Sequence, residues 1–599
     1  MSLKRLGADW LFTDTSPSDV FTPERLSDEH RLIAQTAAEF IRNEVAPALG
    51  ELENKNWTLA RKLVARAGDL GLIGVDVPEV FGGVGLDKAA AIVVGEAVGE
   101  AASFATTFGA QTGLAIIPIL CFGTPEQQQK YLPRIVSGEW IGAYCLSESG
   151  SGSDALSARA KAVKQADGSW VLNGEKMWIT NGGFADVFIV FAQVDGEQFS
   201  AFVVERGFPG VANGKEEHKL GLHGSSTTPV VLSDAKIPAG NLLGEVGRGH
   251  KIAFNVLNYG RFKLAAMCTG GARGTIAEAA AYASTRRQFG EPIANFGAIR
   301  HKLAEMSTRL YAVESMLFRT TGLIDRQIEA LPAETPEGAK AGAHAGDPVA
   351  KALEEFALEA SLLKVASSEM VDFIVDENVQ IHGGNGFVAD YPAERRYRDA
   401  RVNRIFEGTN EINRLLMPGI LIKRGLKGGL PLIQAAKAVR DELMTVAPLD
   451  ASASDAPLAA ETRVAAALRK TVLVAVGLAM ETWGEKLQQE QEALMMISDL
   501  MSEAFAAESA TLRAAQAMAA LSPIASLHVD AAVVITHDAG LRAEATARTL
   551  LGSMLTGDAL RTSLAGLRRV LKVPPTNTVA ARRRIADAVS ARRAYPFSG

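Results

Sequence analysis

The 599-residue sequence predicts a mostly helical α+β protein in which a small antiparallel β domain interrupts a series of helices. Apolar residues recur at helical spacing up to about residue 138 and again from about residue 247 onward. Between these stretches, short β-rich runs alternate with glycine-containing turns. The chain is also too long for one hydrophobic core, so we expect several domains.

We expect four domains: an N-terminal helical domain, a middle β domain, a C-terminal domain of the four-helix-bundle type and an appended helical domain, over residues 1–138, 139–242, 243–425 and 430–599. In the first domain Ile33, Ala37 and Phe40 recur on one helix face. The sequence Thr124-Pro125 is typical of a helix start, because proline suits the first helical turn.

The middle domain is expected from four β-rich runs at residues 170–172, 188–191, 199–204 and 230–232. Tight turns between strands are predicted at Asp167-Gly168, Asn173-Gly174 and Asp195-Gly196. Two loops are expected farther along the chain. An Ala-, Gly-, Pro- and Glu-rich stretch at about 329–348 indicates a mobile insertion, and residues 448–457 form a second loop.

Composition excludes several classes of protein. A net charge of -6, without interleaved basic and aromatic residues, gives no sign of a nucleic-acid partner. The three cysteines lack CxxC spacing and histidine companions, which excludes a disulfide framework and a zinc or other metal site and fits a reducing compartment. No targeting segment is recognisable, and the longest apolar runs have about half the length of a bilayer span, so we expect a cytoplasmic, at most peripherally membrane-associated protein.

Residues 380–414 are the most informative stretch for function. A glycine-rich turn is followed by a short basic helix, and the sequence Phe406-Glu407-Gly408-Thr409 then opens a second helix. Apolar surroundings raise the pKa of a carboxyl toward neutrality, which is what a general base needs. The free N–H groups of a helix start suit an anionic group such as a pyrophosphate. Glu407 is therefore the candidate base, beside an anionic cofactor.

Three further segments suggest cofactor or substrate contacts. The small residues of 144–154 allow a planar ligand close to the backbone. Trp178 and Thr180 project on the same side of a strand, where they offer an aromatic face and a hydroxyl. Arg261, within a helix, and residues 286–290, at a helix end, suit phosphate oxygens. Each signal alone is more often an ordinary loop, core aromatic residue or surface arginine, and only their combination favours a flavin site.

These residues together resemble the acyl-CoA dehydrogenase family over roughly 30–420. The resemblance rests on the glycine loop, the Trp178-Ile179-Thr180 strand, the Arg286 to Gly290 helix end and the Glu407-Gly408-Thr409 turn. It implies the family's fold of helical, β and helical-bundle domains, with FAD as cofactor and acyl-CoA as substrate. The appended helical module is similar to that of the very-long-chain subgroup.

The resemblance assigns a role to each matching residue. Glu407 corresponds to the base that removes the α-proton of the acyl thioester, while Gly260 occupies the alternative base position. Cofactor contacts are implied for Tyr144, Leu146, Ser147, Gly152, Trp178, Ile179, Thr180, Thr409 and Glu411. Contacts to the FAD of a neighbouring subunit, and hence a homodimer, are implied for Arg286, Gln288, Phe289, Gln380, Gly383 and Gly384. Substrate contacts are implied for Ser153, Asn258, Arg261, Phe406 and Gly408.

The sequence departs from the family pattern at a few places. Ser149 replaces a common proline, Asn258 replaces an aspartate of several members, and the insertion at about 329–348 is unusual. Small and apolar side chains follow Thr112 in the stretch 111–117, where medium-chain members close the acyl tunnel with a polar residue. We therefore expect a deeper tunnel and a preference for long acyl chains, since each buried CH₂ contributes about 0.8 kcal/mol.

The basic C-terminal segment has two possible interpretations. Arginines and one lysine between residues 561 and 593 alternate with apolar residues such as Leu564, Leu567, Ile585 and Val589. They form either a membrane-surface element or a helix pair that covers the core with a charged outer face.

The sequence thus predicts an FAD-dependent long-chain acyl-CoA dehydrogenase of fatty acid β-oxidation that passes electrons to an electron-transferring flavoprotein. Two alternatives stay open at this point. An acyl-CoA oxidase would use the same base and flavin but pass electrons to O₂. An assembly or scaffold protein would keep the fold with chemistry secondary.

Overall fold

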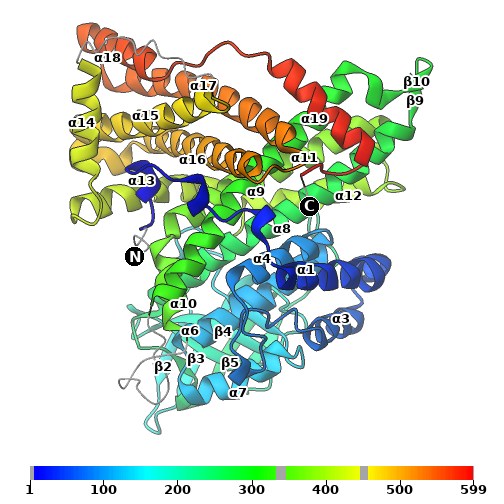
Figure 1. The fold of residues 1–599 in the computed structure, drawn as a ribbon. Helices are drawn as coiled ribbons and strands as arrows, with labels where there is room; N and C mark the ends of the chain where they lie inside the picture. The colour runs from blue at the N-terminus through cyan, green and yellow to red at the C-terminus, as the bar shows by residue number, and fades with distance from the viewer. Residues whose placement is uncertain (1–5, 332–345, 445–455, 598–599) are drawn as a thin grey trace.

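A computed structural model describes residues 6–331, 346–444 and 456–597. The core of the expected insertion and most of the expected loop at 448–457 lie outside these residues. Figure 1 shows the sheet below a central group of long helices, with the appended helices crossing above them. The three expected helical regions and the interposed β domain are all present.

The N-terminal helical domain contains short helices that bury alanine, valine and phenylalanine side chains. Its helices are α1 Asp28–Phe40, α2 Leu49–Glu53, α3 Trp57–Asp69, α4 Lys88–Gly99, α5 Ala102–Gly109, α6 Ile116–Phe122 and α7 Pro125–Val136. The predicted start of α7 is confirmed, because the Thr124 side chain accepts a hydrogen bond from the Gln127 backbone N–H. A π-helical segment, η7 Ala110–Ala115, joins α5 to α6.

The segment Ala102–Phe122 is long and apolar enough to span a membrane by length and composition, although its most apolar window is 83% buried inside the protein. The sequence analysis expected only shorter apolar runs. The difference arises because η7 continues the helix between two such runs. The buried position identifies this segment as part of the core.

The middle domain is an eight-stranded sheet with the order β6-β7-β3-β2-β4-β5-β8, and β1 also pairs with β4. Its strands are β1 Gly142–Cys145, β2 Lys161–Lys164, β3 Trp170–Thr180, β4 Val187–Val194, β5 Gln198–Glu205, β6 Val211–Asn213, β7 Thr227–Ile237 and β8 Leu242–Leu243. The sheet is mixed, whereas the sequence analysis predicted an antiparallel one. Both β1 and β2 run parallel to β4 and share one of its edges.

Two of the three predicted turns are confirmed. Asp167-Gly168 connects β2 to β3, and Asp195-Gly196 connects β4 to β5. The prediction at Asn173-Gly174 is wrong, because this pair lies inside β3 at a register shift. A side chain on Gly174 would place its Cβ 2.7 Å from the Cβ of Ala160, so glycine serves close strand packing here.

The third domain is built on long helices that cross the centre of the molecule. They are α8 Gly249–Thr285, α9 Gly297–Ala330, α10 Asp347–Glu355, α11 Ala357–His382, α12 Pro392–Ala400 and α13 Asn410–Leu426. A small hairpin, β9 Arg287–Gln288 and β10 Glu291–Pro292, joins α8 to α9. Short basic α12 and the following helix start at Asn410 confirm the local prediction for residues 380–414.

The appended domain consists of α14 Leu432–Met444, α15 Ala459–Trp483, α16 Gln491–Ala519, α17 Ala525–Met554, α18 Gly557–Val570 and α19 Thr578–Arg592. Its helices share hydrophobic clusters with the central bundle. The N-terminal segment also contacts this domain, although the sequence analysis grouped it with α1 to α7. Trp10 packs on Phe505 at 4.9 Å between ring centroids, and Arg469 donates to the Trp10 carbonyl.

The C-terminal helices α18 and α19 pack apolar side chains against the rest of the protein. Leu567, Ile585 and Val589 are buried. On the basic side, Arg582 forms ion pairs with Glu305 and Asp538. These contacts favour the helix pair that covers the core over the membrane-surface interpretation.

A buried arginine joins the appended domain to the rest of the molecule. Arg513 of α16 is fully buried and bonds Glu314 of α9 at 2.7 Å and Glu24 at 2.6 Å. Its guanidinium also lies over the Tyr311 ring. Since Glu314 is itself buried, Arg513 compensates a charge that has no access to water.

We expect Arg513→Met to lower the stability of the protein by about 3–5 kcal/mol, because the buried carboxylates of Glu314 and Glu96 must then share the Arg273 guanidinium. The midpoint of thermal or denaturant unfolding measures the effect. Arg440→Met is the matched control, since Arg440 pairs with Glu481 at the surface and such pairs contribute little. Equal midpoints for the two variants would contradict the expectation.

Candidate active site

Glu407 lies in a strained turn directly before α13. Its φ is 59° and that of Gly408 is 78°, so two consecutive residues are left-handed. This conformation is uncommon for a residue with a side chain and needs support from its surroundings. Arg261 donates to the Glu407 carbonyl at 3.1 Å, and Asn413 donates to the Gly408 carbonyl at 2.8 Å. The Thr409 side chain caps α13 by accepting from the Ile412 N–H.

The Glu407 carboxyl faces α8 at Gly260, where that helix has no side chain. A Cβ on Gly260 would lie 2.5 Å from Oε2 of Glu407. This oxygen is buried and has no hydrogen-bond partner in the described protein. Burial raises the pKa of Glu407 to about 7, against the opposing charges of Arg261 and Lys364. An unpartnered carboxyl that titrates near neutrality is suited to take up a proton from a bound molecule.

Arg261 and Asn258 of α8 stabilise the turn at Glu407. Arg261 is 5% exposed, and burial lowers its pKa to about 10. Its Nη1 donates to Oδ1 of Asn258 at 3.2 Å, and Asn258 donates in turn to the Leu353 carbonyl. Arg261 and Asn258 thus stabilise the turn, in addition to the substrate contacts that the family resemblance implies for them.

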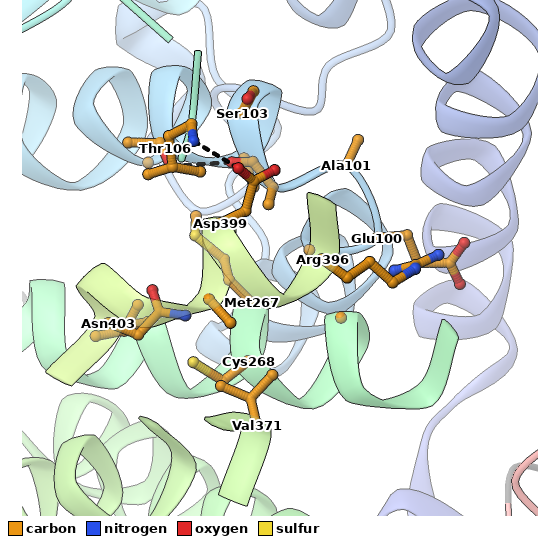
Figure 2. Close-up of a pocket in the computed structure, with 18 of the residues that line it drawn as sticks. Glu100, Ala101, Ser103, Thr106, Met267, Cys268, Val371, Arg396, Asp399 and Asn403 are labelled. Atoms are coloured by element: carbon orange, nitrogen blue, oxygen red, sulfur yellow. Dashed lines mark hydrogen bonds between the residues drawn. The ribbon is translucent and has the colours of Figure 1, made fainter. Parts of the chain in front are cut away.

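A cavity of about 450 Å³ contains Glu407, with Phe406, Gly260 and Thr180 also in its wall. Figure 2 shows α8 residues Met267 and Cys268 facing Thr106 of α5 and Asn403 across this space. Such a volume is typical of a small-molecule site. The α5–η7 segment contributes small side chains and one leucine to the wall, at Ala102, Ser103, Ala105, Thr106, Gly109, Ala110, Gly113 and Leu114.

The stretch 111–117 therefore lines the cavity only in part. Gln111 is turned away from it and bonds the Ile135 and Trp140 carbonyls and the Gly142 N–H. Thr112 donates to the Phe108 carbonyl. The helical spacing of Thr106, Ala110 and Gly113 is the signal that locates the lining face.

The predicted contacts from the β domain lie on two neighbouring segments. Tyr144 is partly buried, its hydroxyl has no hydrogen-bond partner among the described residues, and Leu146 and Ser147 follow it. Gly152 and Ser153 are exposed on the glycine loop. The loop is fixed by Glu148, which pairs with buried Lys176 at 2.6 Å. Sequence analysis missed this ion pair because its partners are far apart in the chain.

Trp178 and Thr180 flank Ile179 at the end of β3, and Ile179 is buried. A bulge between Lys176 and Ile179 gives Trp178 a φ of 57°. Trp178 is 58% exposed, and Thr180 lines the Glu407 cavity. An exposed aromatic face next to a cavity-lining hydroxyl fits a planar ring.

The segments expected to reach a neighbouring subunit lie together, outside the wall of the Glu407 cavity. The β9–β10 hairpin carries Gln288 and Phe289, with Arg286 at the end of α8. The end of α11 carries Gln380, and Gly383 and Gly384 follow it. Tyr282 joins the two segments by stacking on His382 with 4.0 Å between ring centroids. Phe289 is 95% exposed.

Sequence analysis also missed a buried polar group at the start of α13, the helix that follows Glu407. Lys364 of α11 is fully buried and donates to Oδ1 of Asn410 at 2.6 Å. The only signal was a lysine within an otherwise apolar helical run. Glu411, by contrast, is exposed in the first turn of α13.

Comparisons with known proteins fit this geometry. Models of the acyl-CoA dehydrogenase N-terminal, middle and C-terminal domains match residues 27–139, 143–235 and 247–419. The chain belongs to the acyl-CoA dehydrogenase family. A further acyl-CoA dehydrogenase C-terminal domain model matches residues 467–569 in the appended domain.

Several relatives of this acyl-CoA dehydrogenase are known. It is 44% identical to a probable acyl-CoA dehydrogenase of Bacillus subtilis over 97% of both chains. It is 41% identical to the human very long-chain specific acyl-CoA dehydrogenase over 58% of this chain and 51% of the relative. A crystal structure of a Bacillus anthracis acyl-CoA dehydrogenase complexed with FAD has a TM-score of 0.96 at 44% identity, covering 99% of this chain and 100% of that one.

The pKa of Glu407 predicts the acid limb of the pH profile. With Glu407 as the base, kcat/KM for an acyl-CoA falls as the pH drops below about 7, because burial raises the pKa of this carboxyl and the protonated form accepts no proton. The loss approaches tenfold per pH unit. Initial rates measured over a pH series check this, and an acid limb near the ordinary glutamate value of 4.5 would contradict it.

Proposed function

We propose that this protein is an FAD-dependent dehydrogenase of long-chain acyl-CoA thioesters, forming trans-2-enoyl-CoA in fatty acid β-oxidation. The observation that carries the proposal is the Glu407 carboxyl, buried in the cavity wall with Oε2 unpartnered. The likeness to an FAD complex over nearly the whole chain supports the choice of cofactor. Family membership supports the reaction class.

In this reaction Glu407 removes the C2 proton of the thioester. Burial raises the pKa of the carboxyl to about 7, which suits a base that works near neutral pH. The hydrogen bonds from Arg261 and Asn413 hold the backbone turn in place. Trp178 and Thr180 would hold FAD from the β3 side of the cavity. Tyr144, Leu146 and Ser147 lie on the neighbouring segment, where the Ser147 carbonyl accepts from the Met177 backbone N–H at 2.9 Å. When bound, FAD would accept the hydride from C3.

The cavity wall supports a long acyl chain. Where a large polar side chain would block the space, α5 and η7 offer Gly109, Ala110 and Gly113. Met267 and Val371 add apolar surface from α8 and α11. Each CH₂ group of substrate buried there contributes about 0.8 kcal/mol.

A homodimer and an electron-transferring flavoprotein complete the proposal. The exposed Phe289 and the neighbouring turn at Gly383 lie outside the Glu407 cavity, where they are free to contact a second subunit. No Cβ on Gly383 or Gly384 would meet another described atom, so the turn is open to a ligand. Family membership is the support for the flavoprotein as electron acceptor.

Anaerobic titration with hexadecanoyl-CoA tests the reaction class and the base together. We expect the visible flavin band of the native protein to bleach and that of Glu407→Gln to persist, because the amide removes no proton. The variant still binds FAD and unfolds at the same temperature. An unchanged flavin band in the native protein, or bleaching in Glu407→Gln, would refute the proposal.

Ala110→Leu tests the direction of the acyl tunnel. The larger side chain fills part of the cavity, so kcat/KM for hexadecanoyl-CoA drops roughly tenfold or more, while that for butanoyl-CoA changes little. Thr112→Val is the matched control, because Thr112 lies on the same segment and faces away from the cavity. An equal loss for both substrates, or a native optimum at butanoyl-CoA, would count against a long-chain tunnel.

A further inference from the structure

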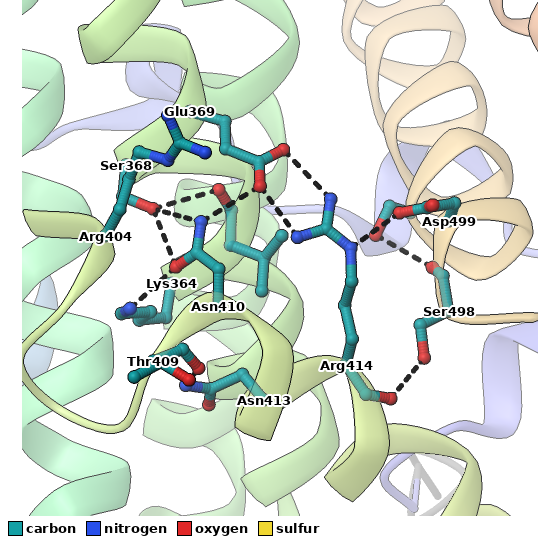
Figure 3. Close-up of polar contacts among 12 residues, drawn as sticks. Lys364, Ser368, Glu369, Arg404, Thr409, Asn410, Asn413, Arg414, Ser498 and Asp499 are labelled. Atoms are coloured by element: carbon teal, nitrogen blue, oxygen red, sulfur yellow. Dashed lines mark hydrogen bonds and ion pairs between the residues drawn. The ribbon is translucent and has the colours of Figure 1, made fainter. Parts of the chain in front are cut away.

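A continuous series of polar contacts links the appended domain to the helix that follows Glu407 (Figure 3). Asp499 of α16 accepts from Nε of Arg414 at 2.8 Å. The neighbouring Ser498 hydroxyl donates to the Arg414 carbonyl. Arg414 of α13 is therefore held at both its guanidinium and its backbone by adjacent residues of the appended domain.

The series continues from Arg414 into the bundle. Both terminal nitrogens of Arg414 bond the two carboxylate oxygens of Glu369, at 2.7 and 3.0 Å. Such a bidentate pair fixes the orientation of both groups. The same carboxylate accepts from Nδ2 of Asn410 at 3.0 Å, and Oδ1 of Asn410 accepts from Lys364 at 2.6 Å and from Ser368 at 3.2 Å.

The inner members of the series lie away from water. Lys364 and Ser368 are fully buried and Asn410 is 1% exposed. A buried polar network is stable only when its donors and acceptors are matched, so the position of one member depends on the others. Asn410 opens α13 three residues after Glu407, and its neighbour Thr409 caps that helix.

Lys364 also interacts with the Glu407 charge. Burial lowers the pKa of Lys364 to about 8, and the charge of Glu407 acts against this lowering. Reciprocally, the Lys364 ammonium favours the ionised form of Glu407. The Asn410 amide, which Asp499 reaches through Arg414 and Glu369, determines where that ammonium lies.

We propose that the appended domain positions the catalytic base: Asp499 orders Arg414, Glu369 and Asn410, and Asn410 holds the Lys364 ammonium at the start of α13, the helix that follows Glu407. Lys364 is thus a positioning residue of the reaction. The inference rests on the role of Glu407 proposed above. It gives the appended domain a part in catalysis through the bundle, without a residue in the cavity wall.

Other charged or titratable groups also act on this site. The positive charge of Arg261 on α8 favours the ionised form of Glu407. Burial, and then the Glu407 charge, raise the pKa of the Tyr144 phenol on β1. Glu411 of α13 acts on Lys364. Among the described residues none of these groups bonds Asp499, so the bonded route from Asp499 to the Glu407 turn runs through Arg414 and its partners.

The test compares variants of the holoenzyme at the two ends of the series. Lys364→Met keeps the chain length of the side chain and removes its charge. The pKa of Glu407 then rises, since its ionised form loses a nearby cation, and the base is protonated over a wider pH range. We expect the acid limb of kcat/KM to move upward by about one pH unit, a roughly tenfold loss on the acid side that recovers at alkaline pH.

Asp499→Ala removes the outer end of the series at a half-exposed surface position. We expect the acid limb to move in the same direction by a smaller amount, and hydrogen exchange at residues 405–413 to become faster. Glu503→Ala is the matched control, because this residue lies on the same helix and bonds Arg542 instead. The double variant Lys364→Met with Asp499→Ala should shift the limb by less than the sum of the single shifts.

Thermal midpoint and flavin content identify any variant that fails to fold, and Asp499→Ala then carries the test alone. If Asp499→Ala matches Glu503→Ala in pH profile and hydrogen exchange while Glu407→Gln abolishes turnover, the inference is wrong and the proposed function stands. Full turnover by Glu407→Gln would overturn both.

Discussion

The central constraint is the burial of one carboxyl group opposite a glycine. Glu407 reaches α8 at Gly260, where any side chain would come within 2.5 Å of Oε2. Removal from water raises its pKa to about 7, and no hydrogen bond from the described residues stabilises its free oxygen. Carboxylates are rarely buried without a partner, since desolvation costs several kcal/mol. The surrounding structure must therefore hold Glu407 in place by other means.

That support comes from side chains that bond the backbone and not the carboxyl. Arg261 and Asn413 bond the carbonyls of the left-handed turn, and Thr409 caps the next helix. Behind the turn, Lys364 and Asn410 link it to Arg414 and so to the appended domain. The carboxyl stays free for a proton because its neighbours are engaged elsewhere. In this way contacts within the helical bundle and from the appended domain offset the strain and desolvation at the site.

Sequence reasoning predicted features that depend on local patterns. The β-rich runs, the Thr124 helix start and the Glu407-Gly408-Thr409 turn were recognisable because spacing and residue type determine them locally. It failed at Asn173-Gly174, where the close approach of Ala160 makes a turn signal into a bulge. The parallel pairing of β1 with β4 was likewise hidden, because the two strands are distant in the chain.

The side-chain network of the site was beyond sequence reasoning for the same reason. Arg414 and Asp499 are 85 residues apart, and Lys176 and Glu148 are separated by 28. Only the fold decides that Gln111 turns to the Ile135 carbonyl while its neighbour Ala110 faces the cavity. Long-range pairs of this kind have no periodic signature.

The most direct test of the central claim is exchange of the C2 proton of a bound acyl-CoA with D₂O, followed anaerobically by mass spectrometry across the pH range. The structure predicts exchange that increases with pH through about 7, as burial sets the pKa of Glu407, and that is absent from Glu407→Gln. Exchange that persists in Glu407→Gln, or that shows no pH dependence around neutrality, would contradict it.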